Sequence, residues 1–412
     1  MANFYDIPLQ ESELLNRPNQ TFTVKGQAGL LATALALDVP VLSSDTNTLV
    51  GFTSFQAGTG ASFAVSRAEH ELVPLIRDKL VNTSSEVQDR WKRTLFQGSR
   101  NERFVVKRIV PSKDSANPSD APRLAPLVNE IRILSNQRLK QCPFIVPLIA
   151  LSWYESQVNG RFWPQLLLEA ADEGTLTEYL ASSEISFNTQ LALSQEIAQG
   201  LKYLHDQGIV HCDLKPGNML VYSKNVSSER LEMCINAGIE PVEVKICDFG
   251  FAVILSDYEA GRRFQARIGT VPWMAPELDM AEPVALDLLH KADIYSFGLV
   301  VASILMRGVR PFQGLLAGEI TELKGQTIGS SDSVVTTLLG NIQEKITLNE
   351  HQEEFIEAFL SGVCEPEPED RVCLAAVQRY LFMGMLQCLA DGEPLIPTAF
   401  FPDLDDAYPG YL

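Results

Sequence analysis

The stretch "HCDLKPGNML", residues 211–220, decides how the chain is interpreted. Asp213 is suited to accept a hydroxyl proton or to align that hydroxyl. Lys215 lies two residues on, where its charge can stabilise a phosphoryl group in transfer, and Asn218 offers an amide oxygen to a hard cation. We therefore expect a loop that handles phosphate.

A second stretch, "VKICDFG" at residues 244–250, supplies a carboxylate that can bind a metal ion beside the first stretch. It predicts a buried strand that ends in Asp248, a carboxylate beside a flexible glycine and well suited to Mg2+. Phosphoryl transfer requires positioning and charge stabilisation more than covalent chemistry. The two stretches together predict a phosphoryl-transfer site.

Three weaker signals precede these stretches in a workable order. "AGTGASFAV", residues 57–65, offers Gly58 and Gly60, whose backbone amides can approach phosphate oxygens, although a plain hairpin turn has the same pattern. "FVVKRI" ends a β-branched run with Lys107, and such a lysine normally faces solvent. Glu130 lies on the polar side of a predicted helix, within reach of Lys107 if the helix packs on the sheet.

Taken together, these residues resemble the signature set of the eukaryotic protein kinase family. The resemblance covers about residues 46–390. "GTVPWMAPE" (269–277) is similar to the end of a kinase activation segment, and "KADIYSFG" (291–298) resembles the helix that places a buried aspartate, here Asp293, beneath the catalytic loop. In "PEDRV", Arg371 matches the arginine that pairs with the family's A-P-E glutamate, here Glu277.

The resemblance implies an α+β, bilobal protein kinase fold with a small β-sheet-plus-helix N-lobe and a larger helical C-lobe. It implies an N-lobe over residues 46–170, with an insertion at about 66–102, and a C-lobe over 171–390. An N-terminal extension of unknown role would precede them at 1–45, and a Pro-rich acidic tail would follow at 391–412.

The resemblance also implies the cofactors, ATP and Mg2+. Lys107, held by Glu130, would position the α and β phosphates, while Asn218 and Asp248 would hold the metal. Asp213 would orient the incoming hydroxyl. The residues implied for the adenine pocket are Val65 and Val105 above the base, Leu220 below it, Leu168 as gatekeeper, and the backbone of Glu169 and Ala171.

Three departures from the family pattern affect the interpretation. Cys212 replaces the H-R-D arginine, so we expect activity that does not depend on an activation-loop phosphate contacting this position. Phe63 replaces the third glycine of the Gly-rich loop, and we expect this to change nucleotide affinity without removing catalysis. The span from Val65 to Lys107 is long, and the insertion either docks a regulatory partner, as the termini also could, or decorates the lobe.

Lys215 and Thr270 resemble the serine/threonine pattern, and "ADIYSFGLVVASIL" (292–305) is most similar to the tyrosine-kinase-like group. We therefore expect phosphorylation of Ser/Thr hydroxyls in a protein substrate. The main alternative is a pseudokinase that acts as a nucleotide-binding scaffold or signalling module. A small-molecule kinase is disfavoured by the "GTVPWMAPE" segment. Candidate phosphoacceptors are Ser256, Tyr258 and Thr270, the last with a structural role as its alternative.

Composition limits the partners and the location. The 412 residues carry a formal charge of −19, which argues against nucleic acid and anionic membranes. Apolar runs are shorter than the roughly 20 residues that cross a bilayer, so we expect no membrane span. The acidic N-terminus does not resemble a signal peptide, and the seven cysteines form no CxxC pair. A cytoplasmic protein is expected.

Periodicity predicts helices over 28–37, over 123–139 and up to Gly208. Strands are expected over 144–154 and 162–169. Three segments, 223–241, 313–333 and the tail, are expected to be mobile or inserted.

Overall fold

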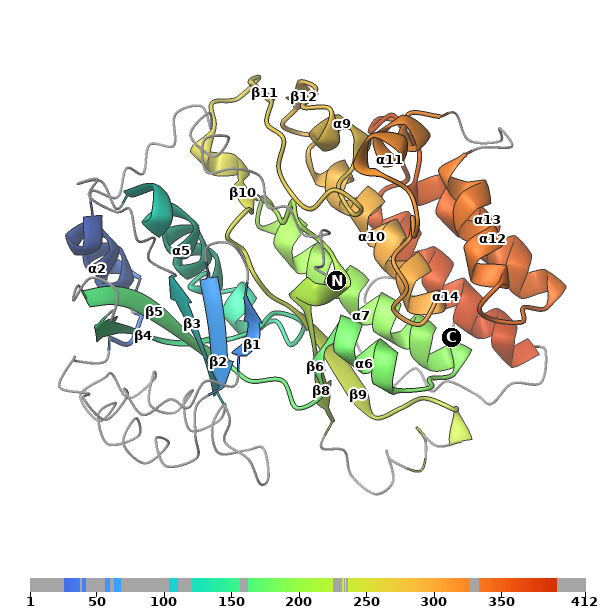
Figure 1. The fold of residues 1–412 in the computed structure, drawn as a ribbon, viewed down its shortest axis with the longest axis horizontal. Coiled ribbons are helices and arrows are strands. Elements are labelled where there is room, and N and C mark those ends of the chain that lie inside the picture. The colour runs from blue at the N-terminus through green and yellow to red at the C-terminus, as the bar shows by residue number, and fades with distance from the viewer. Residues whose placement is uncertain are drawn as a thin grey trace.

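The chain folds into two lobes of different construction. The structure is a computed structural model, and it describes residues 26–37, 39–41, 56–59, 63–67, 104–109, 121–155, 162–224, 232, 234, 236–326 and 333–390. Within the described residues, the smaller lobe contains one β-sheet and the helices α2 and α5, and the larger lobe is mainly helical (Figure 1). The predicted α+β, bilobal class is confirmed.

The smaller lobe is built on an antiparallel five-stranded sheet in the order β1-β2-β3-β5-β4. Its strands are β1 Gln56–Thr59, β2 Phe63–Arg67, β3 Phe104–Ile109, β4 Leu148–Glu155 and β5 Phe162–Glu169. β-Branched and aromatic residues favour these strands. The register sets Lys107 of β3 opposite Val65 of β2, which places the lysine at the centre of the sheet.

Helix α5, Ala121–Leu134, packs close to this sheet and ends five residues before the predicted boundary at 139. The side chain of Asn136 explains the early stop. Its Oδ1 accepts hydrogen bonds from the backbone N–H groups of Arg138 and Leu139. Asn offers the backbone this local alternative to helical bonding, so the helix gives way to a turn.

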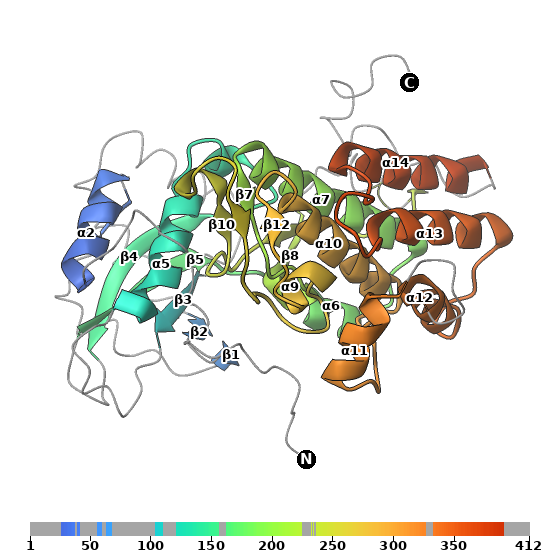
Figure 2. The ribbon, with the colours of Figure 1, turned by 90° about the horizontal axis from the view of Figure 1, so that it is seen from above.

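Helix α2, Gly26–Ala36, packs against α5 (Figure 2). It confirms the helix predicted over 28–37. Leu30 and Ala34 are fully buried on its inner side. The chain then joins the edge of the sheet, because the Pro40 carbonyl accepts from the Leu151 N–H at 2.9 Å and Val41 bridges Leu151 in parallel.

The larger lobe is organised around the long helix α7, which makes contacts with α10 and α14. Gly208 has a φ of +65° and its N–H donates to the His205 carbonyl, which confirms the predicted glycine cap. The helices are α6 Leu176–Ser182, α7 Phe187–Asp206, α9 Pro276–Asp279, α10 His290–Leu305, α11 Ala317–Lys324, α12 Val334–Gln343, α13 Glu350–Val363 and α14 Leu374–Ala390.

Short strands and turns hold the loops that face the smaller lobe. The strands are β6 Gly174–Thr175, β7 Ile209–Val210, β8 Met219–Ser223, β9 Val242–Ile246, β10 Val253–Ile254, β11 Arg263–Phe264 and β12 Val284–Ala285. Among the described residues they form the small sheets β6-β8-β9, β10-β7 and β11-β12. The 3-10 turns η4 Pro216–Asn218 and η5 Leu255–Asp257 accompany them, whereas η3 Leu139–Gln141 lies between α5 and β4 in the smaller lobe.

Two expectations about these elements were wrong. The segment 313–333 contains helix α11, which is anchored by buried Ile320 and Lys324 and so is not a mobile insertion at 317–324. β9 ends at Ile246, two residues before Asp248, because Asp248 adopts a left-handed backbone with a φ of +65° that no strand accommodates. The insertion at 66–102 beyond Arg67, most of 225–235 and the tail from 391 lie outside the described residues.

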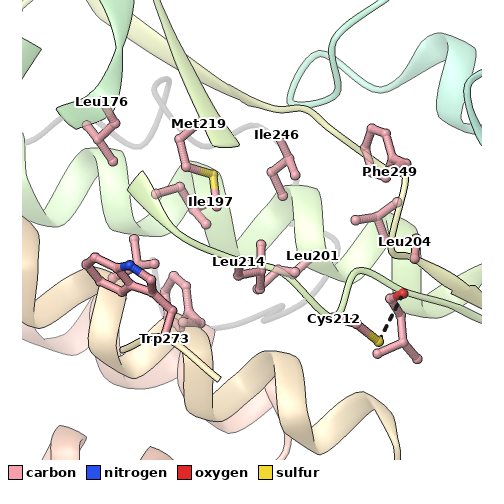
Figure 3. Packing of buried hydrophobic residues seen from close by; sticks show 14 of the residues in the cluster. Leu176, Ile197, Leu201, Leu204, Cys212, Leu214, Met219, Ile246, Phe249 and Trp273 are labelled. Carbon is pink, nitrogen blue, oxygen red and sulfur yellow. Dashed lines mark hydrogen bonds between the residues drawn. The ribbon is translucent and has the colours of Figure 1, made fainter. Parts of the chain in front are cut away.

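A continuous apolar core supports these loops from below. Figure 3 shows the part of the core that lies against residues 211–220, the first signature stretch. There, side chains of α7 meet those of β8, of β9 and of the loop that contains Leu214. The residues there include Ile197, Leu201, Leu214, Met219 and Phe249. Within the residues that the structure describes, no helix combines the length and the apolar character that a bilayer crossing requires.

Candidate active site

Lys107 joins three elements at the boundary between the lobes. Its Nζ donates to Glu130 Oε2 of α5 at 2.7 Å and to Asp248 Oδ1 at 2.8 Å. The Lys107 side chain is only 5% exposed, and that of Glu130 is fully buried. The Lys107 ammonium group thus fixes α5 and residues 244–250, the second signature stretch, relative to the sheet.

These contacts shift the pKa values of all three groups. Burial alone would lower the pKa of Lys107, but the charges of Asp248 and Glu130 raise it above its ordinary value. Burial raises the pKa of Glu130, against the opposing charge of Lys107. Burial also acts to raise the pKa of Asp248, but Lys107 outweighs it and brings the value to about 2. Lys107 and Asp248 are therefore charged at neutral pH.

The expected pairing of Glu130 with Lys107 is present, but the burial of Glu130 differs from the expectation. Its spacing suggested the polar side of the helix, whereas the carboxylate is buried against the sheet. Oε2 binds Lys107, and Oε1 has no hydrogen-bond partner among the described residues. A buried carboxylate is tolerated here because the lysine compensates its charge.

Asp213 lies at the centre of a polar cluster in the first signature stretch. Thr270 Oγ1 donates to Asp213 Oδ1 at 2.7 Å, and Asn218 Nδ2 donates to Oδ2 at 3.1 Å. Lys215 Nζ lies 3.1 Å from Oδ2 and also donates to Thr270 Oγ1 at 2.7 Å. The structure therefore brings together Asp213, Lys215, Asn218 and Thr270, with the carboxylate held in one orientation.

The backbone under this cluster is fixed by Asp293 of α10. Its two carboxylate oxygens accept from the N–H groups of His211 and Cys212 at 2.8 and 2.9 Å, and His205 Nε2 lies 2.9 Å from Oδ2. Burial acts to raise the pKa of Asp293, but the His205 hydrogen bond and charge lower it below its ordinary value. The resulting anchor holds Cys212 at a φ of +63°, a conformation that costs non-glycine residues energy.

Asn218 and Asp248 provide the oxygen atoms that Mg2+ prefers. Asn218 uses Nδ2 for both of its bonds to Asp213, so its amide oxygen is not engaged by them. The Asp248 side chain is 39% exposed and uses Oδ1 for Lys107. The Cys247 N–H donates to the Asn218 carbonyl at 3.0 Å, so Asn218 and Asp248, the two candidate metal ligands, lie on adjacent segments of the backbone. This donor chemistry fits a magnesium ion completed by phosphate and water oxygens.

The residues expected around adenine come from both lobes. Val105 of β3 stands opposite Leu168 of β5, and Leu168 is buried. Leu220 lies on β8 and is half-buried. The Glu169 backbone carbonyl accepts a long hydrogen bond of 3.4 Å from the Tyr222 hydroxyl, and Lys245 binds its carboxylate at 2.6 Å. Ala171 follows on the linker between the lobes and is buried.

The Gly-rich hairpin is described only in part. Backbone pairing sets Gly58 of β1 opposite Val65 of β2, with an irregular register before Gly58. Phe63 begins β2 opposite Ile109. Gly60 lies outside the described residues.

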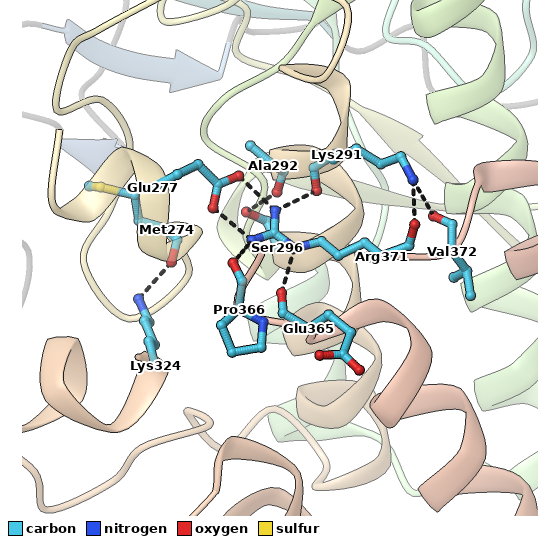
Figure 4. Close-up of polar contacts among 10 residues, drawn as sticks. All are labelled: Met274, Glu277, Lys291, Ala292, Ser296, Lys324, Glu365, Pro366, Arg371 and Val372. Carbon is cyan, nitrogen blue, oxygen red and sulfur yellow. Dashed lines mark hydrogen bonds and ion pairs between the residues drawn. The ribbon is translucent and has the colours of Figure 1, made fainter. Parts of the chain in front are cut away.

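The segment from Asp248 to Glu277, here called the activation segment, is tied down at its far end. Arg371 NH1 and NH2 donate to the two carboxylate oxygens of Glu277 at 2.6 and 2.7 Å (Figure 4). Backbone carbonyls of Lys291, Glu365 and Pro366 accept the remaining guanidinium bonds. The predicted pair is confirmed as a buried ion pair.

Sequence reasoning missed two residues that shape the activation segment. Asn129 Nδ2 donates to the carbonyls of Phe249 and Ala252. Lys324 Nζ donates to the carbonyls of Val271 and Met274, both at 2.6 Å. The available signal for Asn129 was its place inside a helix, where asparagine is a poor helix former; no comparable signal marked Lys324.

Comparison with known proteins is consistent with this arrangement. Residues 93–383, more than half of the chain, match the protein kinase domain. The serine/threonine/tyrosine-protein kinase HT1 of Arabidopsis thaliana is 32% identical over 153 residues, which are 36% of this chain and 33% of that protein.

Two further relatives show similar partial coverage. The serine/threonine-protein kinase CLA4 of Saccharomyces cerevisiae is 26% identical over 260 residues, 61% of this chain and 25% of its own. The human serine/threonine-protein kinase ULK1 is 30% identical over 220 residues, 53% of this chain and 18% of its own. The chain thus spans a third or less of the length of these relatives.

Proposed function

Because the chain belongs to the protein kinase family, we propose that it transfers the γ-phosphoryl group of ATP to Ser/Thr hydroxyls of protein substrates. The observation that carries this proposal is the contact of Lys107 with both Glu130 and Asp248. A cation held by carboxylates from two further elements is a preorganised place for phosphate oxygens.

In the proposed mechanism, Lys107 positions the α and β phosphates and Glu130 keeps the lysine in place. Asp213 accepts the hydroxyl hydrogen bond of the substrate and aligns its oxygen for attack. Lys215, 3.1 Å from Asp213, neutralises charge that builds up on the transferred group. Positioning and charge stabilisation of this kind are the main contributions of a protein to phosphoryl transfer.

Asn218 and Asp248 are the residues that would hold Mg2+. The ion, when bound, supplies charge neutralisation between the phosphates. The depressed pKa of Asp248 keeps its carboxylate ionised, as a metal ligand requires. The proposed adenine pocket consists of Val65, Val105, Leu168, Leu220 and the backbone of Glu169 and Ala171, with Gly58 and Gly60 over the phosphates.

Specificity for Ser/Thr is supported by Lys215 and Thr270, which hydrogen-bond each other at 2.7 Å beside Asp213. The serine/threonine names of the relatives point the same way. Membership of the tyrosine-kinase-like group remains our proposal from the motif resemblance.

The domain limits and the cellular location are also proposals. We assign an N-terminal extension over 1–45, lobes over 46–170 and 171–390, an insertion at about 66–102 and a tail over 391–412. We propose a cytoplasmic location from the sequence, in which the seven cysteines form no CxxC pair. A regulatory partner would bind the insertion or the termini.

A pseudokinase that serves as a nucleotide-binding module is the second candidate. Two replacements favour it, Phe63 in the Gly-rich loop and Cys212 beside Asp213. The retained set of Lys107, Glu130 and Asp213 speaks for catalysis instead.

The test is transfer of labelled phosphate from ATP and Mg2+ to a basic protein substrate, followed by identification of the labelled residue type. Asp213→Asn keeps the shape of the side chain and should abolish transfer while nucleotide binding persists. Asp206→Asn, an exposed carboxylate paired with Lys202, is the matched control and should leave transfer unchanged. Nucleotide binding without transfer in the unmodified protein would favour the pseudokinase.

A further inference from the structure

Helix α5 contacts the beginning of the activation segment directly. Asn129 Nδ2 donates to the Phe249 carbonyl at 3.0 Å and to the Ala252 carbonyl at 2.6 Å. Gly250 lies so near the helix that an added Cβ would be 3.2 Å from the Cβ of Pro126. The first residues of the segment therefore follow the surface of α5.

A second contact follows farther along the segment, between Arg132 and Asp257. Arg132 NH1 donates to Asp257 Oδ2 at 2.6 Å and NH2 donates to Oδ1 at 2.7 Å. The two side chains are only 19% and 11% exposed. A bidentate, largely buried pair of this kind is among the stronger polar contacts in proteins.

The geometry of η5 aims Asp257 at the helix. The turn is held against the larger lobe, because the Leu255 N–H donates to the Gly208 carbonyl at 2.8 Å. Arg132 thus connects α5 to a turn fixed on the larger lobe, across the boundary between the lobes. Glu130, the partner of Lys107, lies two residues away on the same helix.

We propose that Arg132 is a positioning residue, and that its pair with Asp257 holds α5 and the activation segment in the arrangement that forms the Lys107–Glu130 contact, without a phosphate. One rigid helix carries both ion pairs, so loosening one contact shifts the equilibrium of the other. Asp257 supplies the negative charge as a fixed part of the chain.

Cys212 supports the absence of a phosphate requirement. Its thiol is buried and donates to the Val210 carbonyl at 3.7 Å, so it presents no charge to the segment. A later part of the segment packs closely on the Cys212 backbone, where a Cβ at Gly269 would lie 2.6 Å from the Cys212 carbonyl oxygen. The contact at Gly269 is therefore one of backbone packing and involves no charge on the Cys212 side chain.

The catalytic consequence rests on the proposed function, whereas the contact itself is measurable without activity. The variants are Arg132→Met, Asp257→Asn and the exchanged pair Arg132→Asp with Asp257→Arg. The control is Arg262→Met, which removes the exposed Arg262–Glu259 pair of the same segment, where the Glu259 side chain is 78% exposed. Each full-length protein is treated with phosphatase and compared by amide hydrogen exchange and by steady-state kinetics.

We expect amide exchange over 121–134 and 249–264 to be faster in both single variants than in the unmodified protein. In Arg262→Met we expect the exchange over these residues to be unchanged. The kcat should fall on the order of tenfold with a smaller change in KM for ATP, and the exchanged pair should recover part of it. Phosphatase should leave the unmodified enzyme active.

Equal exchange in Arg132→Met and Arg262→Met would overturn the proposal, as would loss of activity on phosphatase treatment. If the unmodified protein transfers no more phosphate than Asp213→Asn, the proposed function fails. The exchange data then decide the Arg132–Asp257 contact alone. If Arg132→Met does not fold, Asp257→Asn and the exchanged pair give the same decision.

Discussion

Lys324 is a buried cation, and its protein contacts compensate only part of the hydration that the ammonium group loses. Its two hydrogen bonds go to backbone carbonyls, and the carboxylate of Asp279 is 3.8 Å away. Burial lowers the pKa of Lys324 to about 8, because the charge of Asp279 offsets only part of the lost hydration. The amine binds the activation segment at Val271 and Met274, so its titration concerns residues 271–274 of that segment.

The stability of the protein should depend on this titration. The folded pKa of about 8 is below the ordinary value of 10.5, so between these pH values only the unfolded chain binds the proton. Burying the protonated Lys324 therefore lowers the free energy of unfolding. This destabilisation is fully present below pH 8 and decreases as the pH rises above 8. Relative to Lys324→Met, the free energy of unfolding of the unmodified protein should increase by about 1–3 kcal/mol from pH 8 to 10.

Urea denaturation at several pH values measures this difference. Lys202→Met, which removes a half-exposed lysine of α7, provides the control and should give a difference that is flat with pH. A flat difference for Lys324→Met as well would contradict the prediction.

The sequence predicted residues well where a contiguous motif placed several groups at fixed spacing. Asp213, Lys215 and Asn218 were identified in this way, and the structure brings them together. Burial was harder to predict. The pairing of Glu130 with Lys107 was anticipated, but periodicity placed Glu130 on the polar side of its helix and did not reveal that its carboxylate is fully buried. Lys324 escaped notice since its partners are backbone carbonyls.

At the scale of elements, α2 is an addition that precedes the part of the chain matched to the kinase family. Leu30 is fully buried against the smaller lobe, whereas Leu35 on the same helix is 63% exposed. The two leucines differ in burial and not in chemistry.

Leu30→Ala should destabilise the protein by about 2–5 kcal/mol, because it removes apolar contacts and leaves a cavity. Leu35→Ala should change the free energy of unfolding by less than about 0.5 kcal/mol. Chemical denaturation of both variants gives the comparison. Similar values for the two substitutions would mean that α2 does not pack on the lobe in solution.

The pair of Arg371 and Glu277 connects α9 to the loop before α14. Arg371→Gln should cost about 3–5 kcal/mol, because it leaves a buried carboxylate uncompensated. Arg307→Gln, which breaks the exposed pair with Glu184, should cost less than about 1 kcal/mol. Thermal unfolding followed by circular dichroism tests both, and a small effect at Arg371 would count against a structural role for the pair.

Elements were predicted in type more reliably than in extent. The glycine cap at Gly208 ended α7 as expected, since a local residue determines it. The end of α5 depended on the Asn136 side chain, and α11 depended on packing of Ile320 and Lys324, which composition does not reveal. Gly/Ser content alone made 313–333 look irregular.

At the scale of the whole molecule, the formal charge of −19 should influence the choice of substrate. A negative field attracts cationic peptides over about 10 Å at 0.1 M salt. We expect the KM for a basic peptide to rise roughly tenfold between 0.02 and 0.3 M salt, about the range over which screening takes effect.

Steady-state kinetics with a neutral peptide of the same acceptor sequence is the control, and its KM should stay constant. An equal rise for both peptides would assign the effect to the enzyme itself. The two-lobe architecture was predicted from the resemblance to the kinase family. The position of α2 was not predicted, because it depends on contacts between distant segments.

The docking of α2 and the hairpin β1–β2 has a practical consequence for recombinant expression. A fragment that begins at residue 93, where the family match starts, would lack all three elements. β3 would then become a sheet edge with unpaired backbone groups, and the α2-facing side of α5 would be bare. Exposed edges and apolar faces promote aggregation. A fragment intended for purification should therefore begin before Gly26.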